Sequence, residues 1–409
     1  MKVLIFSLFL IFFSGNSLFA QGYYYSLKTP QNEILENFTE ISNINELIAG
    51  LKSDSNLYLL PGTYTLNSRI NLRNIYNLNI TGAADGVVIS GNLETLIQFE
   101  EDAHNISFKN VTFNSTSSTT AINFGGLINF SQTNAENILF DGCRFSSPKI
   151  DTNGLKFTSQ GPYRSSKIMI INCIFQDIGR MAIETVNHDW DDISRFEDVT
   201  VKDCYFNNLG TTSKYGMAIS LSGTGRNANI LNNIIVDAKD RAIENVAWND
   251  VVIENNSFSS VNNAYNPITL NRRAGGSLYM TGVAIIGNSG TVTGNAAHLN
   301  ELYNCDGLEY SKNSFYADAL HLSDVKNSSF TNNFHSSDGG IGLYVENKSN
   351  SNTFYDNTFI TIRDYADTVA FFPGATGNTL QRNEILKKGN GGMAYNDMDG
   401  GNYNLDLNN

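Results

Sequence analysis

Basic, aromatic and imidazole side chains are scarce in this acidic chain, yet several gather in its central part. Cleavage of an acidic polysaccharide by β-elimination needs a cation beside the uronate carboxylate, a base for the carbon-bound proton and an acid for the leaving oxygen. Arg272 and Arg273 are candidates for the cation. Lys156, His188 and Tyr163 are candidates for the other two roles. His188 is the leading base, because an unperturbed imidazole has a pKa near neutrality.

Carboxylates offer a second chemistry in the same region. Glu184 and Glu244 fall at one position of a repeat, two repeats apart, which predicts about 9 to 10 Å between their strands. That spacing is at the upper limit for the two carboxyl groups of an inverting glycosidase. Alternatively, Glu184 pairs with Lys156 and Glu244 pairs with Arg241, as parts of a solvated acidic edge.

Three aspartates beside His188 form a further candidate site. Asp189, Asp191 and Asp192 offer the carboxylate oxygens that Ca²⁺ prefers, and they are also candidates for an acid or a base. Ca²⁺ is the one cofactor that the sequence suggests. In the alternative, His188 is a loop histidine bonded to Asp189 or Asp191.

A repeated strand must position these groups. The tripeptide Ala-Ile-X recurs at Ala182-Ile183-Glu184, Ala218-Ile219-Ser220 and Ala242-Ile243-Glu244. Because side chains alternate across a strand, the X residue points outward when the isoleucine points inward. The predicted outward column consists of Lys156, Glu184, Ser220, Glu244, Thr269, His298, His321 and Tyr344.

Small residues stand two positions before each member of this column, for example Gly154, Ala182 and Ala218. A flat strip would let an extended glycan lie close to the sheet, and the polar column beside it would contact successive sugars. The alternative is that small residues only avoid crowding where the chain turns into the strand.

Longer connections follow Phe157, Val186 and Leu270, and long loops on a rigid scaffold commonly carry function. They and the short connections between them hold basic and aromatic residues. The predicted substrate-binding residues are Arg164, Trp190, Arg226, Trp248, His298, His321 and Tyr344.

A second strand in each repeat ends at a bend. Its key position is Asn110, Cys143, Cys173, Cys204, Asn233, Asn256, Asn288, Asn313, Asn333, Asn357 and Asn383, at intervals of 20 to 33 residues. Short β-rich repeats with Asn at a bend, where side-chain amides can bond along an axis, favour a parallel β-helix. The Leu-x-x-Leu-x-Leu pattern of leucine-rich repeats is absent.

With these repeats, the chain resembles the right-handed parallel β-helix superfamily, which includes pectate lyases, polysaccharide lyases of the chondroitinase B and alginate lyase kind, and β-helix glycoside hydrolases. The run from Glu244 through Asn256 to Thr269-Leu270-Asn271-Arg272-Arg273 is similar to the chondroitinase B and alginate lyase group. The resemblance covers residues 55 to 390 and implies an all-β fold, a right-handed parallel β-helix. The repeats predict a single domain of about eleven to twelve coils, because stacked units share one core. The apolar spacing from Ile41 to Leu51 predicts a short N-terminal helical cap.

The rest of the chain sets boundaries and environment. Residues 1–20 read as a secretory signal peptide with cleavage after Ala20, which predicts a secreted or periplasmic protein without a membrane span. Residues 21–54 are an N-terminal segment with the helical cap, and 391–409 a polar C-terminal tail. The net charge of −13 argues against nucleic acid as a partner. Cys143, Cys173 and Cys204 stack at one repeat position, which favours buried, reduced thiols.

The sequence thus predicts a monomeric carbohydrate-active enzyme that degrades an anionic, uronate-containing polysaccharide by β-elimination. A glycoside hydrolase that uses paired carboxylates in the same groove is the first alternative. A non-catalytic glycan-binding or surface structural protein is the second.

Overall fold

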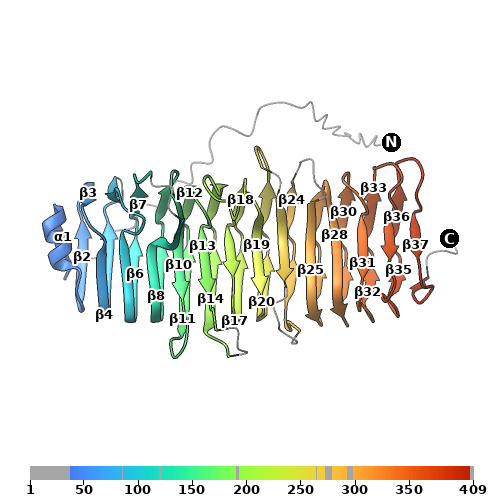
Figure 1. Ribbon diagram of the computed structural model, residues 1–409, viewed down its shortest axis with the longest axis horizontal. Helices are drawn as coiled ribbons and strands as arrows, with labels where there is room; N and C mark the ends of the chain where they lie inside the picture. The colour runs from blue at the N-terminus through green and yellow to red at the C-terminus, as the bar shows by residue number, and fades with distance from the viewer. Residues whose placement is uncertain are drawn as a thin grey trace, which may run out of the picture. The chain divides into compact units, whose positions relative to one another are not determined.

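The chain winds into stacked coils whose strands are all paired in parallel. The computed structural model describes residues 37–84, 86–118, 122–189, 193–263, 265–271, 279–292 and 298–405, with the backbone alone for 122–124, 298, 299 and 318. Within the unit Glu36–Asn409, the coils follow one another in sequence order (Figure 1). Residues 1–36, which include the predicted signal peptide, lie outside the described part.

Each coil has three faces, which we call first, second and third in chain order. Strands of the first face are β10 (Asp151–Thr158), β13 (Ile183–Val186), β16 (Ile219–Leu221), β19 (Arg241–Val246), β22 (Asn266–Asn271), β31 (Leu343–Glu346), β34 (Val369–Phe371) and β37 (Tyr395–Asp397). Five longer strands begin on this face and run past its corner: β4 (Ile70–Gly82), β6 (Ile97–Lys109), β8 (Ile122–Asp141), β25 (His298–Asp306) and β28 (Asp318–Lys326).

The second face continues the same sheet of 25 strands. Its other strands are β1 (Thr39–Ile41), β2 (Ser55–Leu59), β11 (Ser165–Ile171), β14 (Phe196–Lys202), β17 (Gly225–Leu231), β20 (Trp248–Glu254), β23 (Ala284–Ile286), β26 (Glu309–Ser311), β29 (Ser329–Thr331), β32 (Thr353–Tyr355), β35 (Thr379–Gln381) and β38 (Tyr403–Asn404).

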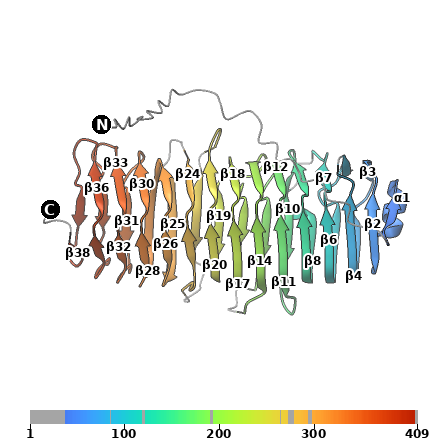
Figure 2. The ribbon, with the colours of Figure 1, turned by 180° about the vertical axis from the view of Figure 1, so that it is seen from behind.

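The third face is a separate sheet, visible from behind in Figure 2. It contains β3 (Gly62–Leu66), β5 (Val87–Gly91), β7 (Thr112–Ser115), β9 (Arg144–Ser147), β12 (Ile174–Ile178), β15 (Tyr205–Leu209), β18 (Ile234–Val236), β21 (Ser257–Ser259), β24 (Ser289–Thr291), β27 (Ser314–Tyr316), β30 (Phe334–Ser337), β33 (Thr358–Thr361) and β36 (Glu384–Lys387). With one strand per coil, the described residues make thirteen coils, slightly more than the predicted eleven to twelve.

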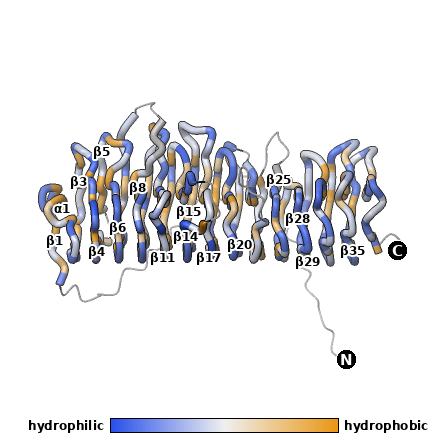
Figure 3. The backbone as a smooth tube through the Cα atoms, turned by 60° about the horizontal axis from the view of Figure 1, so that its bottom comes forward, coloured by the Kyte–Doolittle hydropathy of each residue, from blue (hydrophilic) through white to orange (hydrophobic). Residues whose placement is uncertain are grey.

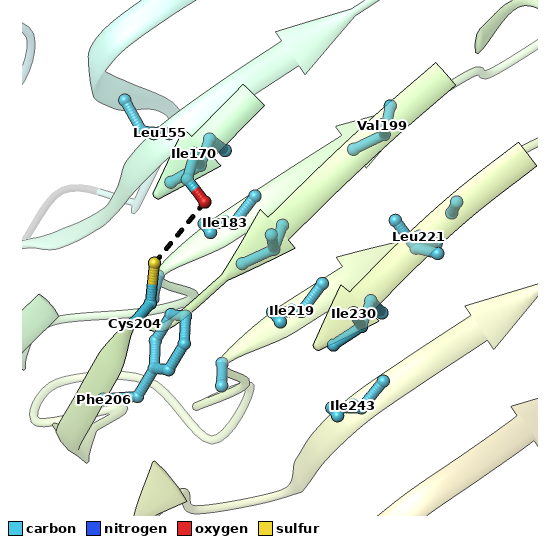
Figure 4. Close-up of a cluster of buried hydrophobic side chains, with 14 of the residues drawn as sticks. Leu155, Ile170, Ile183, Val199, Cys204, Phe206, Ile219, Leu221, Ile230 and Ile243 are labelled. Atoms are coloured by element: carbon cyan, nitrogen blue, oxygen red, sulfur yellow. Dashed lines mark hydrogen bonds between the residues drawn. The ribbon is translucent and has the colours of Figure 1, made fainter. Parts of the chain in front are cut away.

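The core is a set of apolar columns inside the coils. Hydrophobic residues alternate with hydrophilic ones along the coils (Figure 3). Ile183, Ile219 and Ile243 lie in register on successive strands of the first face (Figure 4). Phenylalanines stack in the same way: the rings of Phe145 and Phe175 are 4.7 Å apart and nearly parallel. Identical side chains meet because parallel strands in register place each residue above its repeat equivalent. The prediction of a single parallel β-helix is confirmed.

The bend after the second face is built as predicted from asparagine and cysteine. Asn256 donates its side-chain N–H to Asn288 Oδ1 at 3.0 Å, and Asn288 donates likewise to Asn313 at 3.1 Å. These amides are buried, so the ladder satisfies groups that water cannot reach. Asn110 is an exception, because it has φ 55° and directly precedes Val111, which takes the ladder position.

All four cysteines are buried and free, as expected for the three at the bend. Cys204 lies at this bend, where its thiol contacts the carbonyl oxygen of Ile170 at 3.5 Å (Figure 4). Burial raises the pKa of Cys173 well above its ordinary value and that of Cys305 to about 12. These thiols therefore serve as small core side chains.

The predicted helical cap is present as α1 (Ile44–Gly50), which begins at the N-cap Asn43 and buries Leu47. It is the only helix among the described residues, and none of them forms a helix long and apolar enough to cross a membrane. The predicted tail from residue 391 is different: β37 and β38 pair with β34 and β35 and continue the stack. The sequence did not predict these strands because they are polar. They are the last strands of the described stack, so no further coil in it buries them.

Candidate functional site

The register of the first face defines one outward residue per coil, which we call the outward row. It contains Gln98, Asn129, Lys156, Glu184, Ser220, Glu244, Thr269, Glu301, His321, Tyr344 and Ala370. The predicted row is correct except at His298, whose backbone pairs with Asp318 three residues earlier. Leu302, not Leu299, aligns with the inward Leu270. Glu301 therefore takes the place that the sequence analysis gave to His298.

The row of small residues is not a binding strip. Ala182, Ala218 and Ala242 are fully buried in the apolar core, and a Cβ added to Gly154 would come within 2.9 Å of the Phe175 ring. The chain turns inward here as it passes from the third to the first face, so only small side chains fit. The alternative interpretation, crowding at a turn, is the one that the structure supports.

A buried ionic group, the Glu184 cluster, occupies the N-terminal half of the outward row. Lys156 Nζ lies 3.0 Å from Glu184 Oε2, and Asn153 donates its amide N–H to the same oxygen at 2.6 Å. The Arg180 guanidinium lies 3.7 Å from Glu184 and 4.0 Å from Asp151. Side chains of Lys156 and Glu184 are only 6 % and 7 % exposed, so this pair is satisfied within the protein.

Glu244 is paired in a similar way. Its carboxylate lies 3.2 Å from Arg241 and accepts a hydrogen bond from the Ser220 hydroxyl at 3.3 Å. Burial raises the pKa of Glu244, against the opposing effects of Arg241, Ser220 and Asn271. Both ion pairs of the alternative interpretation of Glu184 and Glu244 are present, but the two carboxylates are buried and do not form a solvated edge.

Farther along the row, four side chains form a different arrangement, which we call the His321 network. Tyr303 Oη lies 3.0 Å from His321 Nδ1, and His321 Nε2 lies 3.2 Å from Glu346 Oε1. Tyr344 donates its hydroxyl to Glu346 Oε2 at 2.9 Å. A carboxylate only accepts, so Glu346 selects the tautomer with hydrogen on Nε2. Nδ1 then accepts the Tyr303 hydroxyl.

The electrostatics of the His321 network favour neutral groups. Burial lowers the pKa of His321, although Glu346 and Glu301 oppose this. Burial also raises the pKa of Tyr303, helped by Glu301 and Glu346, and it raises the pKa of Tyr344 to about 12. A neutral imidazole beside a protonated phenol can take the phenolic proton. In this arrangement His321 is the base for Tyr303, and Glu346 orients the His321 ring.

Further polar groups adjoin this network on its N-terminal side. Asn271 and Tyr303 each stand two residues beyond the paired residues Thr269 and Glu301. It hydrogen-bonds to Glu244 and thereby lowers the pKa of that carboxyl. The positive charge of Arg241 lowers the pKa of Tyr303. A cation, carboxylates and a phenol–imidazole pair therefore share one stretch of the first face.

The predicted loop residues lie elsewhere. His188 and Arg164 are exposed in connections that follow β13 and β10. Four strand spacings, about 19 Å, separate β13 from β25, which carries Tyr303. Tyr163 lies beside Arg164 in the same connection. Tyr163 and His188 are therefore near the half of the row that contains Lys156, whereas His321 and Tyr344 are in the other half.

Trp248 and Arg226, which were predicted to bind substrate, have structural roles. Trp248 is fully buried, stacks on Phe196 at 5.7 Å and fills the space left by Gly225, which stands between them in register. The prediction that Trp248 binds substrate is wrong, because Gly225 has no Cβ and the indole packs inside the core in the space that this leaves. Arg226 is exposed and forms an ion pair at 2.5 Å with Glu197, its in-register neighbour on the preceding coil.

The proposed Ca²⁺ site finds no support among the described residues. Asp189 Oδ2 accepts from the Gly161 N–H at 2.5 Å and from Arg195 at 2.9 Å, and these contacts lower the pKa of Asp189. No group of three His, Cys, Asp or Glu side chains in the described ranges is arranged to hold a metal. Trp190, Asp191, Asp192, Arg272 and Arg273 lie outside the described residues, as does the side chain of His298.

Sequence reasoning missed Tyr303, Glu301, Glu346 and Arg241 as site residues, although it named His321 and Tyr344. Tyr303 and Glu346 stand two residues after members of the outward row, where strand alternation again points outward. Extending the outward reading by one position along each strand would have found them.

No family model and no curated protein sequence matches the chain. Among solved structures, the catalytic unit of an α-1,3-glucanase from Streptomyces thermodiastaticus has a TM-score of 0.56 at 14% identity, covering 89% of this chain and 66% of its own. The A-module of the mannuronan C-5 epimerase AlgE6 from Azotobacter vinelandii has a TM-score of 0.53 at 11% identity, covering 88% and 93%. This chain is a parallel β-helix protein that shares its fold with carbohydrate-processing enzymes.

Proposed function

We propose that the chain is a polysaccharide-degrading enzyme that cleaves a uronate-containing glycan by β-elimination at the His321 network. The observation that carries the proposal is the contact of Tyr303 Oη with His321 Nδ1, with Glu346 on the other ring nitrogen. It supplies a proton acceptor and a proton donor on the outward side of a sheet face.

The chemistry would use one proton-carrying pair twice. Tyr303 passes its proton to His321 as the Tyr303 oxygen takes the proton from the carbon beside the uronate carboxylate. The carbon–oxygen bond to the leaving sugar then breaks, a carbon–carbon double bond forms, and Tyr303 gives the proton it took to the leaving oxygen. His321 then returns its proton to Tyr303, which restores the neutral pair. Glu346 stabilises the imidazolium that exists between these steps.

The elimination also needs positive charge near the uronate carboxylate, because negative charge develops there. Arg241 is the described candidate, although it is shared with Asp240 and Glu244. Arg272 and Arg273 follow Asn271 directly in the sequence, and we keep them as proposed contributors. His188 and Lys156 are not part of this proposal, because Lys156 is paired with Glu184 and His188 lies in an exposed connection.

Hydrolysis is the second candidate function, and the raised pKa of Glu244 favours it. A carboxyl that stays protonated can act as the general acid of a glycosidase. Glu301 stands two strands away in the same row, about 9.6 Å along the stack, at the upper limit for an inverting pair. This pair replaces Glu184 and Glu244.

Export and partners follow as proposals from the sequence. The pattern of residues 1–20 supports a secreted or periplasmic location, where polymeric glycans are met. We propose an anionic polysaccharide as the partner of a monomer. A glycan-binding protein without catalysis is the outcome that the experiment below would distinguish.

The test incubates the mature protein with alginate, pectate, glycosaminoglycans, ulvan and neutral glycans, with and without Ca²⁺. Both new reducing ends and the absorbance of unsaturated uronate are recorded. We expect both signals with an acidic glycan. Reducing ends without absorbance would establish hydrolysis and move the assignment to Glu244 and Glu301, whereas glycan binding with neither signal would contradict an enzyme.

A further inference from the structure

Two aromatic rings adjoin the His321 network on its C-terminal side. We propose that Tyr344 and Phe372 form a sugar-stacking subsite, which binds a pyranose ring of the same glycan next to the cleaved bond. The inference rests on the proposed function. It assigns a role to Phe372, for which neither the network nor the core accounts.

The geometry places the pair at the edge of the network. The Tyr344 ring meets the His321 ring edge-on at 4.5 Å, and the Phe372 ring lies 4.3 Å from Tyr344 at 45°. Ala370 is the in-register neighbour of Tyr344 and has only a methyl group. Phe372 stands two residues further on and donates its backbone N–H to the Val345 carbonyl.

Both rings are half-buried, whereas aromatic rings of the core, such as Phe371, are fully buried. Tyr344 presents an apolar ring while its hydroxyl is held by Glu346. A pyranose has an apolar face of C–H bonds and a polar rim, so it matches an aromatic surface bordered by hydrogen-bonding groups. This surface suits a sugar better than a charged or wholly apolar ligand.

Spacing connects the subsite to the chemistry. Tyr344 stands one strand beyond His321, about 4.8 Å along the stack, and Phe372 lies one strand further. A sugar ring over these residues would therefore place its neighbour over Tyr303 and His321. The glycan would then lie along the stack of coils, with Arg241 at the opposite end of the site.

The structure contains a matched control. Tyr316 and Phe334 form a similar tilted pair, 4.8 Å apart at 43°, on the third face. Phe334 is half-buried, as Phe372 is, but belongs to a different sheet from the His321 network. Removing either ring deletes the same kind of contact, so a difference between the two variants reports on the site.

The experiment uses the mature chain and whichever of alginate, pectate or chondroitin sulfate it degrades. Phe372→Ala should raise KM about tenfold, the effect of one lost stacking contact, and leave kcat within about twofold. Phe372→Tyr, which keeps the ring, should restore KM. Phe334→Ala should change neither constant, and thermal melting checks that all variants fold.

A second measurement separates binding from positioning. Calorimetric titration of the same polymer into a His321→Ala variant should show binding that Phe372→Ala weakens by a similar factor. An unchanged KM and affinity in Phe372→Ala would overturn the subsite, as would a loss of kcat with a shifted pH profile, because the ring would then only position Tyr344. If the parent chain neither cleaves nor binds any of the three polymers, the proposed function fails first.

Discussion

The two halves of the outward row place different kinds of polar contact at the same strand positions: an ion pair in one half and a hydrogen-bonded network in the other. In the N-terminal half, Lys156 and Glu184 neutralise each other while nearly excluded from water. In the C-terminal half, Tyr303, His321 and Glu346 are linked by hydrogen bonds around an imidazole whose pKa is lowered. A satisfied ion pair holds its protons firmly, whereas a neutral imidazole between a phenol and a carboxylate can move one.

The bend of the coils changes at nearly the same place. Cys143, Cys173 and Cys204 occupy it in the N-terminal half, and the ladder of asparagines begins at Asn233. A thiol is a weak hydrogen-bonding group, whereas a buried amide must be fully satisfied. The C-terminal half thus depends on polar contacts at its bend as well as on its first face.

The largest expected effect is on catalysis. His321→Ala should lower kcat/KM about 10²- to 10⁴-fold, the usual contribution of a positioned acid–base group, with little change in melting temperature. His188→Ala, which removes an exposed histidine near the Glu184 cluster, should leave the rate unchanged. If the rates instead fall in His188→Ala and not in His321→Ala, the active half has been assigned to the wrong end of the row.

The next effect is on stability. Glu184→Ala leaves Lys156 buried without its anion, so the free energy of unfolding in urea should fall by about 3 to 5 kcal/mol. Glu197→Ala is the control, because it breaks an exposed pair with Arg226 and should cost less than about 1 kcal/mol. Equal losses in the two variants would show that the cluster is not held as a buried unit.

A smaller loss is expected at the bend. Asn256→Ala removes the oxygen that accepts both the backbone and the side-chain N–H of Asn233, which should cost about 1 to 3 kcal/mol in urea unfolding. Cys173→Ala loses only weak thiol contacts and should cost about 1 kcal/mol. A reversed order would mean that the thiol column, and not the amide ladder, supports the bend.

The finest distinction concerns pH. Activity needs neutral His321, so it is present above the His321 pKa and lost as pH falls through it; the acid limb of kcat/KM should lie below pH 6.5. Glu346→Gln removes a charge that raises this pKa, so the limb should move to still lower pH. Glu184→Gln should not move it. A limb that follows Glu184 would place the titrating group in the other half.

The sequence could predict most of the fold but only part of the site. Alternation around Ile183, Ile219 and Ile243 determined which residues face inward, since a parallel repeat places like residues above one another. His321 and Tyr344 were identified in the same way. His298 failed because β25 runs through a corner, so the periodicity alone could not fix its register.

The sequence by itself determined the repeat, the inward columns and the bend ladder, because each depends on local periodicity and on similar residues one coil away. It also determined the capping helix, which depends on local apolar spacing alone. Only the tertiary structure decided which charged side chains are paired, because this depends on burial and on contacts between coils. It buried Trp248 over Gly225, joined Lys156 to Glu184, and brought Tyr303, His321 and Glu346 within hydrogen-bonding distance.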